Sequence, residues 1–461
     1  MREPERDRPA SDRLPGAAPV APPLRIQRNT APQRVLLPRI DATHRDLLAS
    51  AAAGPDEKRR LVEVRLPALR EALFHSPYWR RTLRDAGLSP RDLTRLENLR
   101  HFPLLTRASL GEAGEELLAL PPGAEERPEA RGLVEVRSSG TTGEPLRALR
   151  DGFGAVRIWA LLRFWIDRLG VTLPRKPRSV LLCTLPGRIE YSVRLPLLFD
   201  GALHRVSALR EGAVEKLRRA RPDVLFSDPA GLHWLAAQEA PPQPRLVLTS
   251  AQRFSPAQRA ALAEVVPAPV VNYYSTAETG PIAWECPQSL GRFHVLEPEV
   301  FVESVGGEIV VTRLTEGIVP LLRYATGDAG AVEDDACPCG RRGPSIVGFE
   351  GRRACRFVRE DGTDCDAWAL EPVFKHLPLS AFRLTQETPS RFLLEATARP
   401  EAEPAHVAAV AVEALRRLGF AGAVVTVAPL PPGPEPVKPE PFRAADAART
   451  DPSSPGTTGT T

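Results

Sequence analysis

Three short polar segments of this chain carry residue types that can hold a nucleotide and a divalent cation. The first has two glycines and four hydroxyl side chains in six residues, after an apolar-alternating run typical of a strand. Because glycine permits tight turns and close approach, such a loop can bring backbone N–H groups and hydroxyls against a phosphate. No Gly-Lys-Ser/Thr follows, so it is not a Walker loop, and a flexible surface loop is the alternative. Its residues are Ser138, Ser139, Gly140, Thr141, Thr142 and Gly143.

The second and third segments each place a carboxylate beside a turn. Glu278 lies shortly after an apolar strand that ends at Tyr273, and a carboxylate next to a phosphate loop is a suitable ligand for Mg²⁺. Asp328 follows a glycine and can accept both hydroxyls of a ribose. Arg352 follows another glycine and is either a linker residue or a fixed cation at a nucleotide. Taken singly, each acid could instead be an ordinary residue of a surface turn.

Three cysteines and a histidine form a separate set. Cys286 and His294 lie close together in the sequence, and Cys337 and Cys339 follow as a second short-spaced pair. Thiolates and an imidazole suit tetrahedral Zn²⁺, and two such pairs can close on one ion. The spacing is unusual for a zinc finger, so buried unpaired cysteines beside a core or surface histidine are the alternative.

Alternating strands and helices must position these segments. Short apolar strands joined by helices predict an α/β fold with a mainly parallel sheet that helices cover on both faces. In such sheets ligands bind at the carboxyl ends of the strands, where the Gly-rich loop and the segment after Tyr273 both fall. The expected strands are 179–184, 223–227, 245–249 and 270–273, and the expected helices are 211–220, 231–239 and 255–265.

The length of 461 residues suggests more than one domain. From about residue 293 the pattern changes to β-strands with few helices, and a small α+β unit follows it. We expect a disordered tail over 1–35, a large domain over 36–352 with a β-rich part at about 285–350, a small mobile domain over 353–446 and a second tail over 447–461.

Composition excludes several classes of protein. The net charge of +4 is small for this length, which argues against nucleic acid or a membrane surface as a partner. No segment reaches the ~20 apolar residues of a membrane span, and the first residues lack a signal-peptide core, so we expect a cytoplasmic protein. Only five of the 61 basic residues are lysines, so clusters such as Arg218, Arg219 and Arg221 are interpreted as solvated helix faces.

Together, in this order and at these separations, the three polar segments resemble the adenylate-forming acyl-CoA synthetase superfamily. The similarity is greatest to its phenylacetate–CoA ligase and coenzyme F390 synthetase-like branch, and it covers roughly residues 45–445. It includes the runs His75–Arg80 and Phe102–Arg107. The resemblance implies a ligase that makes an acyl-adenylate from ATP and a small carboxylic acid, aromatic or apolar, and then transfers the acyl group to a thiol, by family that of CoA.

The resemblance also implies a role for each site residue. Residues 138–143 would hold the β- and γ-phosphates of ATP, and Glu278 would hold Mg²⁺. Tyr274 would lie against the adenine, Asp328 would bind the ribose, and Arg352 would support the ribose and phosphate near the hinge to the small domain.

Two further roles come from the same resemblance. Lys438 would stabilise the charge that develops at the α-phosphate, as the C-terminal lysine of the superfamily does. Some members of the branch share the cysteine and histidine elements, which implies a structural Zn²⁺ with no open coordination position. That ion would hold together the β-rich part that carries Asp328.

Several residues depart from the pattern of the branch. Ala277 replaces a threonine or serine, Glu144 replaces a lysine, and Ala354 or Cys355 stands where a hinge aspartate is usual. Prolines surround Lys438. These departures keep two alternatives open: transfer of the acyl group to a carrier-protein thiol or an amine, and a zinc-stabilised, nucleotide-binding interaction protein with weak or lost catalysis. The oligomeric state does not follow from the sequence.

Overall fold

A computed structural model of the chain describes most of residues 33–444. The described residues are 33–120, 134–137, 147–150, 152–184, 190–195, 201–208, 210–251, 254–315, 317–351, 355–374, 377, 379–398, 403–430 and 442–444. The tail predicted over 447–461 and most of the tail predicted over 1–35 lie outside them.

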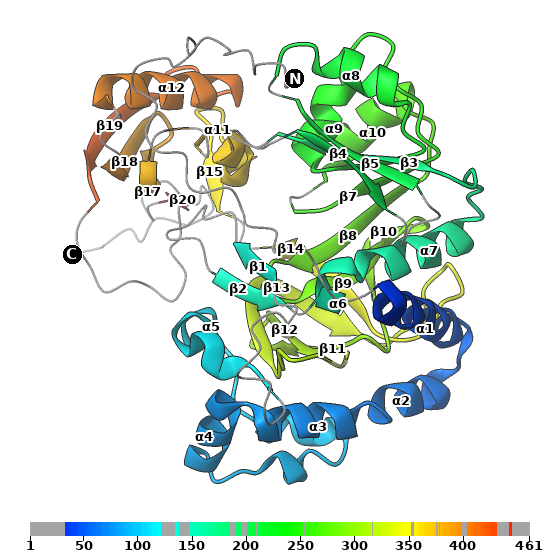
Figure 1. The fold of residues 1–461 in the computed structure, drawn as a ribbon. Helices are drawn as coiled ribbons and strands as arrows, with labels where there is room; N and C mark the ends of the chain where they lie inside the picture. Colours follow the sequence, from blue (N-terminus) through cyan, green and yellow to red (C-terminus); the bar gives the residue numbers. More distant parts are fainter. Residues whose placement is uncertain are drawn as a thin grey trace, which may run out of the picture.

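The first described residues form a group of helices, of which α1 lies beside α7 and α2 to α4 lie below the large sheet in Figure 1. Ser76 caps the fourth of them, because its hydroxyl accepts from the Trp79 N–H and Pro77 fills the first helical position. The Trp79 indole donates to the Pro320 carbonyl at 3.0 Å and is fully buried, so this helix is fixed against the segment that leads to Asp328. These helices are α1 (Gln33–Ala52), α2 (Pro55–Glu63), α3 (Leu66–His75), α4 (Pro77–Asp85) and α5 (Arg107–Ala113).

One sheet runs through the whole centre of the molecule. Its middle strands pair in parallel, and the pairing becomes antiparallel from β8 onward, so the parallel part and the β-rich part are continuous. The described strands lie in the order β11 (Val300–Val305), β12 (Glu308–Arg313), β13 (Tyr324–Glu333), β14 (Ser345–Gly351), β10 (Ser289–Val295), β9 (Gly280–Cys286), β8 (Val270–Thr276), β7 (Leu246–Thr249), β6 (Val224–Ser227), β3 (Arg178–Cys183), β5 (Gly201–Ser207) and β4 (Tyr191–Leu195).

Helices cover both faces of the parallel part, as predicted. Leu225 and Val247 belong to one core cluster with α8 (Ala213–Ala220), α9 (Pro229–Ala236) and α10 (Pro256–Val265). Their neighbours Val224 and Leu246 belong to another cluster with α7 (Ile158–Leu169), because successive strand residues point to opposite faces. The predicted α/β fold is confirmed, although the strands β4 and β5 were not among those expected.

A second, smaller sheet follows β14 and has its own core. In Figure 1 it forms a separate group together with α12. Its four described strands lie in the order β19 (Val424–Pro429), β18 (Arg391–Ala398), β17 (Leu379–Thr388) and β20 (Phe442–Ala444), with α11 (Glu371–Phe374) and α12 (Pro404–Arg417) beside them. Among the described helices, none combines the length and the apolar character that a bilayer crossing requires.

Candidate functional site

A tight hairpin presents Glu278. Strand β8 continues from the parallel part of the sheet and turns back as β9, with Thr276 opposite Gly280. We call the three residues between them, Ala277, Glu278 and Thr279, the glutamate loop. The loop is ordered locally, because the Thr279 N–H donates to the Thr276 hydroxyl at 3.0 Å and Gly280 adopts a φ of +75° that few other residues tolerate.

The carboxylate of Glu278 is buried and has partners. It is 5% exposed, and Arg107 Nη1, at the start of α5, donates to its Oε1 at 3.1 Å. The buried Tyr324 lies on its other side: burial first, and then the charge of Glu278, raise the pKa of the tyrosine. Arg107 was part of the run that resembles the branch, but no role followed for it from the sequence. The contact with Arg107 holds the Glu278 carboxylate in place.

Tyr274 and Asp328, predicted as separate contacts to ATP, touch each other. The Tyr274 hydroxyl donates to Asp328 Oδ2 at 2.7 Å. Burial and the neighbouring carboxylate raise the pKa of Tyr274 well above its usual range, so the tyrosine acts as a neutral donor. The Asp328 N–H donates to the Thr326 hydroxyl at 3.1 Å, and the ring of Phe349 lies 4.4 Å from that of Tyr274. Asp328 is therefore fixed and keeps its second carboxylate oxygen for another donor.

The Gly-rich loop itself, residues 138–143, lies outside the described residues, as do Glu144, Arg352, Ala354 and Lys438. The strands on either side of the loop are described. β1 (Val134–Arg137) pairs antiparallel with β2 (Arg147–Arg150), with Arg137 opposite Arg147. Arg150 at the end of β2 donates to the Thr276 and Ala277 carbonyls, at 2.9 and 2.8 Å. The hairpin that leads into the Gly-rich loop therefore touches the glutamate loop.

The four predicted metal ligands come together. Cys286 ends β9, His294 lies on β10, and Cys337 and Cys339 lie between β13 and β14, with all four ligand atoms within 4.8 Å of one another. The Cys337 and Cys286 sulfurs are 3.6 Å apart, close to the separation of about 3.7 Å that tetrahedral Zn–S bonds of ≈ 2.3 Å impose. This sulfur separation is far too long for a disulfide.

The surroundings of this cluster suit a metal ion. Ser345 Oγ lies 3.2 Å from His294 Nδ1, and His294 Nε2 lies 3.3 Å from Cys339 Sγ. The contact at Nδ1 therefore orients the ring so that Nε2 faces the cysteines. Burial raises the pKa of Cys286 to about 12 and lowers that of His294 to about 3. Without a cation the buried thiol would therefore stay protonated, whereas Zn²⁺ would displace its proton. The donor set fits a closed, structural site.

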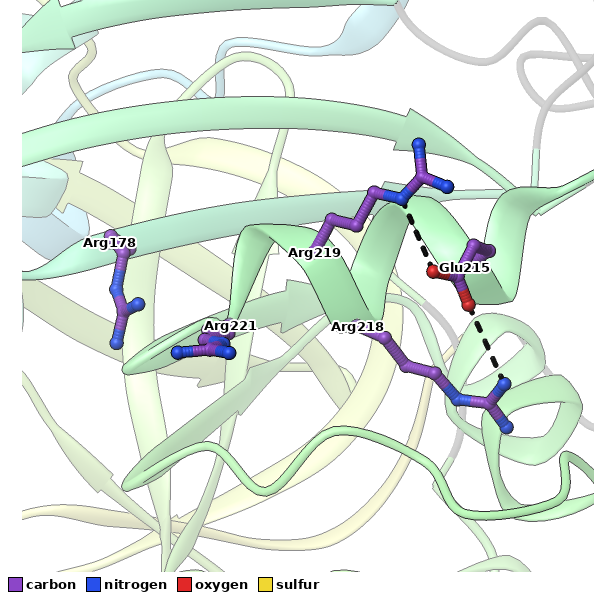
Figure 2. Close-up of a pocket in the computed structure, with 5 residues that line it drawn as sticks. All are labelled: Arg178, Glu215, Arg218, Arg219 and Arg221. Atoms are coloured by element: carbon purple, nitrogen blue, oxygen red, sulfur yellow. Dashed lines mark hydrogen bonds and ion pairs between the residues drawn. The ribbon is translucent and has the colours of Figure 1, made fainter.

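An arginine-lined surface hollow of about 550 Å³ lies away from these groups. Figure 2 shows Arg218 and Arg219 on either side of Glu215, with Arg178 and Arg221 beside them. Because Arg178 begins β3, the hollow lies at the amino ends of the parallel strands, opposite the edge that carries the glutamate loop. The nearest N···O distances from Arg219 and Arg218 to Glu215 are 3.2 and 3.7 Å. Glu215 therefore pairs with two of the four arginines that line the hollow.

Comparisons with known proteins agree with this arrangement. No protein-family profile matches the chain. The phenylacetate–coenzyme A ligase of Thermus thermophilus is 27% identical over 326 residues, covering 62% of this chain and 68% of the relative. The phenylacetate–coenzyme A ligase of Aromatoleum evansii is 25% identical over 350 residues, covering 66% and 73%.

Solved structures show the same fold. A 2-hydroxyisobutyryl-CoA ligase in the postadenylation state matches 86% of this chain and 90% of its own length with a TM-score of 0.56 at 17% identity. The same ligase with 2-HIB-AMP and CoA in the thioesterification state gives a TM-score of 0.55 at 18% identity and covers 86% and 91%. The chain is therefore similar in sequence to phenylacetate–coenzyme A ligases, and it shares its fold with a 2-hydroxyisobutyryl-CoA ligase.

Proposed function

We propose that the protein is an AMP-forming acid–thiol ligase. It would activate a carboxylic acid with ATP to an acyl-adenylate and then form the CoA thioester. The observation that carries the proposal is the gathering of Glu278, Tyr274 and Asp328 at the carboxyl edge of the sheet, in a chain related to phenylacetate–CoA ligases.

Each residue has a distinct task in this proposal. Asp328 accepts the ribose hydroxyls, and Tyr274 holds its carboxylate in one orientation by the 2.7 Å hydrogen bond. The loop 138–143 encloses the phosphates, and Lys438 supplies a positive charge where the α-phosphate gains negative charge. These tasks are positioning and charge neutralisation, which in-line phosphoryl chemistry chiefly requires.

Glu278 fits a magnesium ion that arrives with ATP. Mg²⁺ prefers one or two carboxylates with phosphate oxygens, and Glu278 is a buried carboxylate on a hairpin that Arg150 of β2 contacts. When bound, the ion would neutralise charge on the triphosphate. Arg107, now paired with Glu278, would give up part of that contact and lie close to the phosphates.

An aromatic acid and CoA are the proposed substrates. The names of both relatives support phenylacetate or a similar acid, and they support CoA over a carrier-protein thiol. On α7, the helix that follows β2 and α6, Phe164 and Trp165 are fully buried. Trp159 keeps 8% exposure and meets Phe226 of β6 edge-on at 6.0 Å, so it is the aromatic of this helix best placed to touch an acid.

Acid-dependent exchange of radiolabelled pyrophosphate into ATP tests the proposal. Exchange should appear with one or more aromatic acids from a broad panel, and CoA should then consume the acyl-adenylate in a single turnover. Absence of exchange with every acid, while ATP still binds, would overturn the ligase assignment. Exchange followed by acyl transfer only to an amine or a carrier protein would overturn the choice of CoA.

A nucleotide-binding protein without turnover is the second candidate. It is favoured by the ion pair of Arg107 with Glu278, which competes with a metal ion, and by the missing loop lysine and hydroxyl at Glu144 and Ala277. The same exchange assay separates the two candidates. Binding of Mg·ATP without exchange supports this reading, and exchange excludes it.

We also propose that the Cys₃His cluster holds a structural Zn²⁺. The ion would join β9, β10 and the segment between β13 and β14, all of which lie in the part of the sheet that carries Asp328. With four protein ligands it would offer no open position for chemistry.

A further inference from the structure

Side chains bind the backbone of the glutamate loop and of the residues that flank it. Arg150 Nη2 and Nε donate to the Thr276 and Ala277 carbonyls at 2.9 and 2.8 Å. Arg157 Nη1 donates to the Pro281 carbonyl at 2.9 Å, and the Thr279 hydroxyl donates to the Gly280 carbonyl at 2.9 Å. Two carbonyls before Glu278, at 276 and 277, and two after it, at 280 and 281, therefore accept from side chains, which fixes the direction of the loop.

Two guanidinium groups converge beneath this loop. A Cβ atom on Gly280 would lie 3.8 Å from Arg157 Nη1 and 3.9 Å from Arg150 Nη2. Both arginines come from the segment that directly follows the Gly-rich loop, Arg150 from β2 and Arg157 from the start of α7. The glutamate loop is therefore supported by the part of the chain that carries the proposed phosphate contacts.

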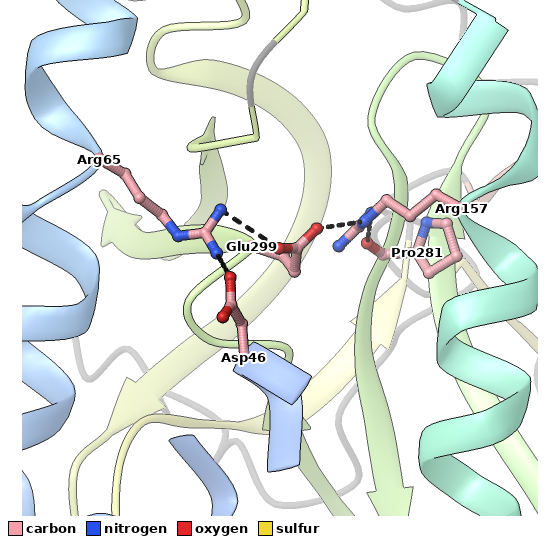
Figure 3. Close-up of polar contacts among 5 residues, drawn as sticks. All are labelled: Asp46, Arg65, Arg157, Pro281 and Glu299. Carbon is pink, nitrogen blue, oxygen red and sulfur yellow. Dashed lines mark hydrogen bonds and ion pairs between the residues drawn. The ribbon is translucent and has the colours of Figure 1, made fainter. Parts of the chain in front are cut away.

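Arg157 is tied into the core. Its Nε donates to Glu299 at 3.0 Å, Glu299 is fully buried, and Arg65 lies 3.4 Å from the other oxygen of the same carboxylate (Figure 3). Arg65 in turn pairs with Asp46 of α1. Burial lowers the pKa of Arg157, and the charge of Glu299 opposes that shift. Its removal would leave a buried carboxylate short of a partner, so Arg157 is a poor residue on which to test function.

Arg150 is different, because it links two loops at the surface of the site. It is half-buried, it lies opposite Val134 at the base of the β1–β2 hairpin, and the far end of that hairpin leads into residues 138–143. Through one guanidinium group the hairpin of the phosphate loop is bound to two consecutive carbonyls of the glutamate loop. At Ala277, whose side chain has no hydroxyl to offer, the backbone carbonyl is the group that is fixed.

We propose that Arg150 is a positioning residue for Mg·ATP, which fixes the backbone that directly precedes Glu278 and thereby the place of its carboxylate. The proposal rests on the ligase function proposed above. If Arg150 only satisfies two carbonyls, its loss should affect folding stability alone. If it positions the carboxylate, its loss should weaken the metal–nucleotide site and leave the acid site unchanged.

The test compares Arg150→Ala and Arg150→Lys with Arg219→Lys, a control on the exposed face of α8 whose side chain is 80% exposed. Lysine keeps the positive charge, but its ammonium group lacks the planar guanidinium geometry that lets Arg150 donate to both carbonyls. We expect hydrogen–deuterium exchange of the peptide 274–284 in the ligand-free protein to be several-fold faster in Arg150→Ala. Because one or two hydrogen bonds are lost, binding of Mn²⁺·ATP, followed by the EPR signal of free Mn²⁺, should weaken about tenfold.

In pyrophosphate exchange, the Mg²⁺ concentration for half-maximal rate should rise about tenfold, while the KM for the acid should stay within about twofold. Arg150→Lys should be intermediate, and Arg219→Lys should match the wild type. A folded Arg150→Ala or Arg150→Lys with wild-type exchange of 274–284 and wild-type Mn²⁺·ATP affinity would overturn the proposal. If the wild type shows no pyrophosphate exchange, the ligase function fails, and the hydrogen-exchange and EPR measurements still decide the role of Arg150.

Discussion

At the scale of single residues, the site contains two carboxylates that have different kinds of partner. Glu278 is paired with a cation, Arg107, whereas Asp328 accepts from a neutral phenol, Tyr274. A neutral donor fixes orientation and leaves the carboxylate charge in place, which suits a group that must accept hydroxyls. A cation neutralises the charge until a stronger cation arrives, which suits a group that meets Mg²⁺ together with phosphate.

Tyr274→Phe tests the first of these pairings. A hydrogen bond to a charged acceptor contributes ≈ 1.5–3 kcal/mol. Its loss should therefore raise the KM for ATP by about tenfold or more and leave the KM for the acid unchanged. Steady-state kinetics at fixed acid and CoA measure this. Tyr78→Phe, at a tyrosine of the N-terminal helices, is the control. An unchanged KM for ATP in Tyr274→Phe would show that Asp328 needs no support from the tyrosine.

A double-mutant cycle tests the second pairing. Arg107→Ala alone leaves a carboxylate that is 5% exposed without its cation, and we expect a loss of about 1–3 kcal/mol in the free energy of unfolding. Arg107→Ala combined with Glu278→Gln should lose less than the sum of the single variants, by about 1 kcal/mol or more. Urea unfolding without nucleotide provides the four values. Additive losses would mean that the 3.1 Å contact contributes nothing.

Both acids of the site could be predicted from the sequence, but their partners could not. Glu278 and Asp328 stand out because, together with the Gly-rich loop, they occur in the order and at the separations of the superfamily's segments. Arginine, in contrast, makes up all but five of the 61 basic residues, so nothing in the sequence distinguishes Arg107 or Arg150 from solvated ones. Tyr274 was expected against adenine, and its bond to Asp328 depends on a fold that brings together residues far apart in the chain.

At the scale of elements, the antiparallel part of the sheet depends on strand ends that meet at the Cys₃His cluster. Cys286 ends β9 and His294 lies near the end of β10, while Cys337 and Cys339 lie in the connection from β13 to β14. Lys58 of α2 is buried and donates to the Arg342 carbonyl in the same connection. A metal ion there would hold three strand ends and, through Lys58, the N-terminal helices.

Metal analysis and chelation test this site. We expect one zinc per chain in protein purified without chelators, and removal by a strong chelator should lower the melting temperature by several degrees, since metal binding is coupled to folding. Cys337→Ser should have the same effect, and Cys183→Ser on β3 should not. Because Asp328 lies on β13, affinity for ATP should fall together with zinc content. If the purified protein contains no zinc and chelation leaves its melting temperature unchanged, the proposed zinc site is ruled out.

Periodicity predicted the elements better than it predicted their pairing. The strand and helix patterns between residues 179 and 273 match β3, β6, β7, β8 and α8 to α10 within a few residues, because apolar runs bounded by turn residues are a local signal. The position of β10 between β9 and β14 is not local: it is decided by contacts across about fifty residues. The sequence therefore predicted a β-rich part within the large domain, but it did not predict how its strands join the parallel ones in one sheet.

At the scale of the whole molecule, the small unit that follows β14 has a sheet and a core of its own. Its four-stranded sheet shares no strand with the large sheet among the described residues, and its core is a separate cluster around Phe357, Phe392 and Phe420. The boundary near residues 352–354 remains a prediction. A unit with its own core can rotate about a short connection without unfolding, which is the mechanical requirement of a two-step ligase.

Lys438 tests whether that movement separates the two steps. If the lysine stabilises only the adenylation transition state, Lys438→Ala should reduce pyrophosphate exchange by about 100-fold or more. Formation of the CoA thioester from synthetic acyl-adenylate should stay within about threefold, because the small unit has then rotated the lysine away. Rates of the two half-reactions, measured separately, check this, with Lys375→Ala as a control at another lysine of residues 353–446. Equal losses in both half-reactions would argue against rotation, and unchanged exchange would show that another cation meets the α-phosphate, for which Arg107 beside Glu278 is the nearest described candidate.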